Sequence, residues 1–95
     1  MEIKTVWVFN SPNSKFSGGV FEQLEAAEEW IERYNLTGVL TKYPLNMGTL
    51  EWALENDSVD MKPEKLKEKQ TDPEFIGGFT SASMEHYHYE NGQKE

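Results

Sequence analysis

One amphipathic helix placed between two strand-like segments limits this chain to a small number of folds. Apolar residues recur at three- and four-residue spacing at Leu24, Ala27, Trp30, Ile31 and Tyr34, which predicts a helix over residues 22–34. The apolar stripe of such a helix has to be buried, and a sheet built from the flanking segments offers a surface against which it can pack.

The two ends of this helix carry signals of different strength. No good N-cap residue precedes it, so the sequence leaves its first residue open. At the other end, Asn35 suits the left-handed conformation that terminates many helices, with Leu36 folding back as the hydrophobic contact.

Four segments have the composition of strands. Residues 3–9 are apolar on both alternating sets from Thr5 to Phe9, which predicts a central strand. Turn-forming residues at 10–14 join it to a second strand over 15–21, where Gly18-Gly19 indicates a bulge or bend. Residues 37–45 and 84–89 predict the third and fourth strands, and Asn91-Gly92 ends the fourth.

The region after the third strand is less regular. Asn46 or Thr49 can cap a short second helix that runs to about Asn56. Residues 57–74 contain four lysines, six acidic residues and two prolines, so we expect a mobile, solvated segment in which Pro63 could open a short helix. Residues 75–83 are compatible with a strand, a bend or a helical turn.

These elements predict a single α+β domain over residues 1–92, with residues 93–95 as a C-terminal tail. The expected order is two strands, a helix, a strand, a helix, a loop and a strand. This order favours an antiparallel sheet of about four strands with the two helices on one face. A chain of 95 residues is long enough for one core and too short for two.

Composition excludes several functional classes. The chain has no Cys, which removes disulfides, thiolate nucleophiles and Cys-based zinc or iron–sulfur sites. Its formal net charge of −8 disfavours binding to nucleic acid or to an anionic membrane surface. No segment approaches the ~20 apolar residues of a membrane span, and the opening residues lack the basic region of a signal peptide, so we expect a cytoplasmic protein.

Short motifs throughout the chain carry a resemblance to a known family. They are VWVFN at 6–10, GVF at 19–21, AEEWI at 27–31, LTG at 36–38, LTKYPL at 40–45, WA at 52–53 and EHYHYENG at 85–92. Together they resemble a family of small bacterial domains of unknown function, over nearly the whole chain except residues 57–74. The resemblance implies a single domain and brings no established activity, ligand or catalytic residue.

The sharpest candidate site is His86-x-His88. On a strand, residues two apart project from the same face, so both imidazoles can reach one divalent metal ion, and Glu90 extends that face. A zinc or iron site needs a third protein ligand, which in a chain with two histidines must be a carboxylate. The alternative is a pair of histidines on a half-exposed sheet face. No catalytic triad, nucleophile elbow or phosphate-binding loop is present, so we assign no catalytic residue and expect no cofactor.

The predicted helix over 22–34 is also strongly acidic. It carries five glutamates, Glu22, Glu25, Glu28, Glu29 and Glu32, against a single arginine. Such a stripe can dock a basic protein partner and steer its approach, or it can be an ordinary solvated face. Twelve aromatic residues, among them Trp7, Trp30 and Trp52, are many for one small core, and any surplus would form a face for a homodimer or another partner.

These features predict a non-enzymatic protein-interaction or accessory module, of the immunity type. The alternative is a metal-dependent enzyme or metal sensor that uses His86 and His88 with a carboxylate. A third hypothesis is a small-ligand binder with a pocket between the sheet and residues 57–74.

Overall fold

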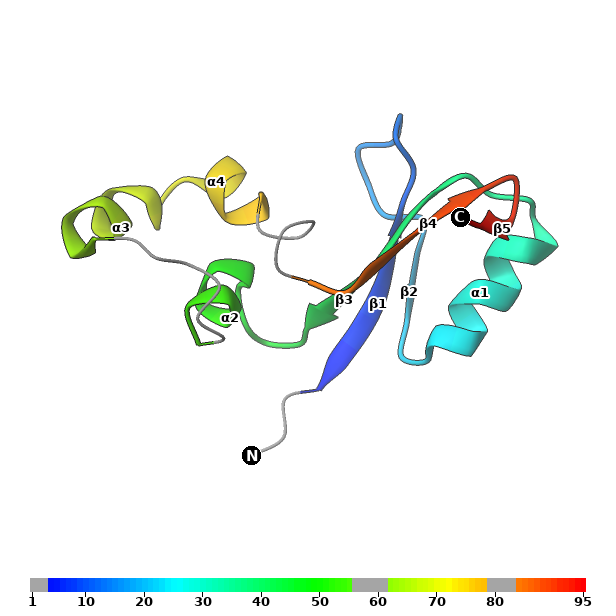
Figure 1. Cartoon of the computed structure of the whole chain (residues 1–95), viewed down its shortest axis with the longest axis horizontal. Helices are drawn as coiled ribbons and strands as arrows, with labels where there is room; N and C mark the ends of the chain where they lie inside the picture. The colour runs from blue at the N-terminus through cyan, green and yellow to red at the C-terminus, as the bar shows by residue number, and fades with distance from the viewer. Residues whose placement is uncertain (1–3, 56–61, 79–83) are drawn as a thin grey trace.

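The computed structural model describes residues 4–55, 62–78 and 84–95 (Figure 1). Over these residues the chain forms one five-stranded antiparallel sheet and four short helices. The strands are β1 (Thr5–Asn10), β2 (Gly19–Phe21), β3 (Gly38–Pro44), β4 (His86–Glu90) and β5 (Gln93–Lys94). The helices are α1 (Leu24–Arg33), α2 (Thr49–Glu55), α3 (Pro63–Lys69) and α4 (Pro73–Gly77). The predicted α+β class is confirmed, with one more strand and two more helices than expected.

The strand order is β2-β1-β3-β4-β5, and every neighbouring pair is antiparallel. β1 and β3 form the longest ladder, from Thr5 opposite Pro44 to Asn10 opposite Val39. β1 therefore lies inside the sheet, as its continuous apolar character predicts. β2 is the edge strand on one side and β5 is the edge strand on the other.

The second strand is shorter than the sequence predicts. Lys15 and Phe16 lie in an exposed loop, and pairing with β1 begins only at Gly19. The Gly18 amide donates to the Phe9 carbonyl at 3.1 Å, while Gly19 is the residue opposite Phe9 in the ladder. Gly18, directly before β2, and Gly19 thus both face Phe9 of β1, which is the β-bulge that the paired glycines indicate.

The last two described strands form a tight hairpin that the sequence pattern does not predict. Asn91 and Gly92 both have positive φ, 50° and 85°, as a two-residue type I′ turn requires. This turn brings Lys94 opposite Tyr89, so residues 93–94 form β5 and not the expected tail. The Asn-Gly pair therefore does more than end β4, because it reverses the chain so that the next residues form a further strand.

α1 packs on one face of the sheet and supplies the core (Figure 1). The fully buried Ile31 and Ala27 of α1 pack with side chains from β1, β3 and β4: Trp7, Phe9, Leu40 and Tyr89. Phe21, Leu24, Trp30, Leu36 and Tyr87 border this cluster. The amphipathic pattern is confirmed except at Tyr34, which is 59% exposed because the helix ends at the preceding residue.

Both ends of α1 behave as the sequence indicates. Gln23 occupies the N-cap position and makes no side-chain capping bond. At the other end, Asn35 has φ 52°, and its amide donates to the Glu32 carbonyl at 3.2 Å. The Leu36 amide donates to the Ile31 carbonyl at 3.0 Å. These two bonds form a Schellman motif with Asn35 in the left-handed position.

The helices α2, α3 and α4 lie beyond the end of β3, on the other side of the strands from α1 in Figure 1. The core on the sheet face therefore contains residues of α1 and none of α2, although two helices were expected on one face. Thr49, one of two expected caps, is the first residue of α2, and its hydroxyl donates to the Ile76 carbonyl at 2.6 Å. This hydrogen bond links α2 to α4.

The segment expected to be mobile and charged is partly helical. Pro63 starts α3, which has no buried residue. Pro73 starts α4, where the Asp72 carboxylate caps the helix by accepting from the amides of Glu74 and Phe75. Residues 57–61 of that segment lie outside the described residues, as do residues 79–83 of the stretch for which the sequence allows several conformations.

Candidate functional site

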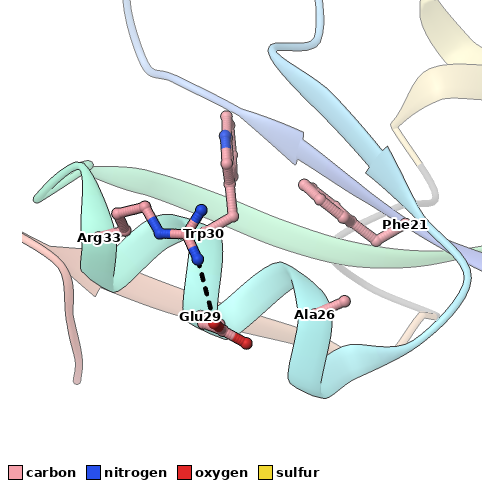
Figure 2. Close-up of a pocket in the computed structure, with 5 residues that line it drawn as sticks. All are labelled: Phe21, Ala26, Glu29, Trp30 and Arg33. Carbon is pink, nitrogen blue, oxygen red and sulfur yellow. Dashed lines mark hydrogen bonds and ion pairs between the residues drawn. The ribbon is translucent and has the colours of Figure 1, made fainter.

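A groove lies between α1 and the edge strand β2 (Figure 2). It has a volume of about 250 Å³, and its lining residues are Phe21, Ala26, Glu29, Trp30 and Arg33. Phe21 comes from β2 and the other four residues come from one flank of α1. The short Ala26 side chain leaves space beside the two rings, so the groove offers an apolar recess next to the sheet edge.

The aromatic part of the groove is fixed by packing. The Trp30 ring contacts Phe9 edge to face, with centroids 5.3 Å apart, and lies 5.2 Å from Phe21. Because Phe9 is buried in the core, Trp30 is anchored on one side while its other side lines the groove. An aromatic ring held in this way loses little entropy when a partner covers it.

Charged groups form the outer rim of the groove. Arg33 donates to the Glu29 carboxylate at 3.1 Å, one turn apart on α1 (Figure 2). Both side chains are largely exposed, so this ion pair contributes little to folding and is available to rearrange around a ligand.

The five predicted partner-binding glutamates separate into three groups in the structure. Glu22, Glu25 and Glu32 are exposed and have no side-chain partner among the described residues. Glu29 pairs with Arg33 at the groove rim. Glu28 points to the opposite flank of α1, where it binds the hairpin of β4 and β5.

Glu28 is the centre of a small polar network. Its Oε2 accepts from the Tyr89 hydroxyl at 2.6 Å and lies 2.8 Å from the Lys94 ammonium. Hydrogen bonds from Lys94 and Tyr89 hold the pKa of Glu28 below its usual range. Burial, followed by the hydrogen bond to Glu28, raises the pKa of Tyr89. This arrangement stabilises the fold. Because the Glu28 carboxylate is bound to Tyr89 and Lys94, it is less available to a partner than the other glutamates.

The two histidines lie on the sheet face away from α1. Alternation along β4 places His86, His88 and Glu90 on the face opposite the buried Tyr89. The imidazole centroids are 5.3 Å apart, and the His86 Nδ1–H donates to the Met84 carbonyl at 2.9 Å, which leaves its Nε2 available. Within residues 4–55, 62–78 and 84–95, no three His, Cys, Asp or Glu side chains gather as a metal site. Metal binding by these residues stays a prediction.

Most of the aromatic residues that the sequence flagged are used in packing. Trp7 and Phe9 are buried, and Trp7 stacks on Tyr87 with centroids 5.7 Å apart. Trp52 is half-buried, and Phe79, another of the twelve aromatic residues, lies outside the described residues. The exposed aromatic residue that sequence reasoning missed is Phe16, 79% exposed in the loop before β2. The turn-forming residues before Phe16 were only a weak indication that its side chain would be exposed.

The fold and the groove define an α+β domain in which one helix covers a five-stranded antiparallel sheet and leaves a recess at the sheet edge. The chain belongs to a family described as a domain of unknown function, DUF7710, whose model matches residues 6–95. Neither the search of curated proteins nor the search of solved structures gave a match. Among the described residues, no helix has the length and apolar character needed to cross a bilayer.

Proposed function

We propose that this domain is a non-enzymatic protein-interaction module that binds a basic protein partner at the groove between α1 and β2. One observation carries the proposal: the aromatic recess made by Phe21 and Trp30 lies beside α1, and α1 also bears exposed carboxylates. Apolar anchors that fill pockets supply most of the binding energy in protein interfaces.

The negative charge carried by α1 and the residue before it favours a cationic partner. Glu22, Glu25 and Glu32 are exposed and unpaired among the described residues, and the whole chain has a net charge of −8. A field of this sign accelerates the approach of a basic partner and repels an acidic one. The recess supplies affinity and the carboxylates supply selectivity.

Affinity capture with matched charge variants tests this function. The wild-type domain and a Glu25→Lys/Glu32→Lys variant are immobilised and exposed to native lysate from the source cells. The control is Glu64→Lys/Glu68→Lys, which makes the same charge change on α3. We expect a basic protein that the wild type and the control retain and that the α1 variant loses.

A second pair of variants separates the recess from the charge. Ala26→Arg fills the groove, and Glu22→Gln removes one neighbouring charge while leaving the recess open. The proposed function requires that Ala26→Arg abolishes capture and that Glu22→Gln weakens it only slightly. Capture that none of the α1 variants changes would place the binding surface elsewhere.

The alternative function, a divalent-metal enzyme or sensor, rests on the adjacency of the His86 and His88 rings. We give the interaction function precedence because its recess is formed by described residues alone, whereas the metal site still requires a third ligand.

A further inference from the structure

We propose that the partner binds as an added strand: an extended segment pairs with the free edge of β2 and inserts an apolar side chain into the groove beside α1. This inference rests on the proposed function and specifies how the partner is bound. Addition of a strand to a sheet edge takes its affinity from main-chain hydrogen bonds and its specificity from pockets for alternate side chains.

Among the described residues, no strand pairs with the outer side of β2. Its inner side pairs with β1. The Phe9 carbonyl accepts from Gly18 at the bulge, so the backbone groups of Phe9 and of the opposing Gly19 point into the ladder. Alternation then places the N–H and C=O of Val20 on the outer edge.

The side chains at this edge suit an apolar strand. Val20 is 60% exposed on the sheet face away from α1, where it can pair across the edge with an apolar residue of the added strand. In the added strand, the residues before and after the one opposite Val20 project to the α1 side, toward Phe21, Ala26 and Trp30 (Figure 2). The groove is therefore placed to receive the alternate side chain.

The occupant is a segment with an apolar anchor flanked by Lys or Arg. Side chains two residues before and after the anchor share its face and lie along α1, on which Glu25 and Glu29 are exposed; Glu22, just before the helix, is exposed as well. A second copy of this chain fits less well, because pairing of two β2 edges would bring the same glutamates of both copies together. Like charges at an interface oppose association.

A synthetic peptide tests the inference on the full chain. The probe is acetyl-Ser-Lys-Val-Phe-Val-Lys-Ser-amide, in which the phenylalanine and both lysines share one face of an extended strand and the valines share the other. Exchange of the Val20 amide hydrogen is followed by NMR. With the peptide at ten times its dissociation constant, we expect that exchange to slow about tenfold, because only about one molecule in eleven keeps that edge free.

Two N-methylated forms of the probe supply the control. In an antiparallel pairing the valine amides point to β2 and the phenylalanine amide points away. Methylation of both valine amides should therefore abolish binding, and methylation of the phenylalanine amide should preserve it. If methylation of the phenylalanine amide abolishes binding and methylation of the valine amides preserves it, the strand is added in the parallel direction. Loss of binding by only one of the two methylated peptides therefore supports the inference.

A variant of the chain gives an independent measurement. Val20→Pro removes the outward amide, and Val20→Thr keeps it with a side chain that also favours strands. We expect the first variant to lose the peptide and the second to retain it, while both keep wild-type chemical shifts in β3.

Three other results would overturn the inference. If the peptide shifts Trp30 resonances while Val20 exchange is unchanged and both methylated forms bind, strand addition is wrong and the proposed function survives. If 1 mM peptide shifts no resonance of α1 or β2, strand addition is wrong and the groove is not the partner-binding site of the proposed function. Concentration-dependent dimerisation that protects Val20 without peptide would identify a second copy as the occupant.

Discussion

The Tyr89 hydroxyl donates to the Glu28 carboxylate at 2.6 Å and thereby joins two elements that are 61 residues apart in the chain. Lys94 lies 2.8 Å from the same carboxylate oxygen, and its ammonium lies 4.1 Å from the centroid of the Tyr87 ring. One acidic side chain of α1 thus holds the hairpin of β4 and β5. The acidic character of α1 consequently has a structural component at Glu28 and a surface component at the other glutamates.

Removal of the Glu28 charge should destabilise the fold. Glu28→Gln weakens two hydrogen bonds that involve charge, each of the order of 1.5–3 kcal/mol when buried and less at this half-exposed position. We expect a loss of about 1 kcal/mol or more, measured by urea unfolding. Glu25→Gln is the control, with an expected change within ~0.5 kcal/mol, because Glu25 has no partner among the described residues. Equal effects of the two variants would contradict this role.

The same carboxylate should make stability depend on acid pH. Because Lys94 and Tyr89 lower the pKa of Glu28 in the folded state, the carboxylate stabilises the fold above its unfolded pKa. That stabilisation is lost as the pH falls through the lowered, folded-state pKa. Urea unfolding at pH values from 7 to 3 should therefore show a smaller decline for Glu28→Gln than for the wild type. Parallel curves for the two proteins would be evidence against the coupling.

Gly92 should tolerate no larger residue. Its φ of 85° strains any L side chain, and an added Cβ would lie 3.1 Å from the Asn35 Cα and 3.3 Å from the Ile31 carbonyl oxygen. We expect Gly92→Ala to cost more than about 1 kcal/mol in unfolding free energy. Gly77→Ala is the matched control, since nothing lies within 4 Å of the methyl group it would add and alanine favours the helix. The control should be neutral or slightly stabilising.

Excess Zn²⁺ or Ni²⁺ should stabilise the untagged protein only slightly. Two imidazoles without a third close ligand among the described residues fall short of the three or four that zinc sites use. We expect the Tm to rise by less than about 4 °C, equivalent to less than ~1 kcal/mol for a domain of this size. A rise above ~10 °C that His86→Ala and His88→Ala both remove would instead establish the metal function.

α3 should exchange its amide hydrogens much faster than the sheet. Seven residues with no buried side chain cannot hold a helix in water by local propensity. Hydrogen exchange should therefore be fast in Pro63–Lys69 and slow in the β1–β3 ladder. Protection of α3 equal to that of β3 would show that the predicted mobility of residues 57–74 is wrong.

The parts of the fold that can be predicted from the sequence are those governed by local rules. The period of α1 and the Schellman motif at Asn35 depend on residues within a few positions of one another, and both are confirmed. The Gly18-Gly19 bulge is indicated for the same reason. The β5 strand was missed because its two polar residues, Gln93 and Lys94, carry no strand pattern. Only the preceding Asn-Gly turn indicates that a strand follows.

The groove could not be predicted because its walls come from different elements. Ala26 and Arg33 fall outside the apolar stripe of α1, and their position beside Phe21 follows from the way the helix lies over the sheet. The charge pattern singled out α1, the helix that borders the groove. It offered no means of separating Glu28, which binds Tyr89 and Lys94, from the exposed glutamates.

The position of β4 in the strand order affects how the chain folds during synthesis. β3 can pair with β1 once both strands have been made, but its other edge has no partner until β4, which begins more than forty residues after β3 ends, has also been made. Until then the nascent domain presents an open, β-branched edge to neighbouring chains. Translation that pauses within the charged region between α2 and β4 should therefore produce aggregation-prone intermediates, and the lysines and acids concentrated there would help to keep such intermediates apart.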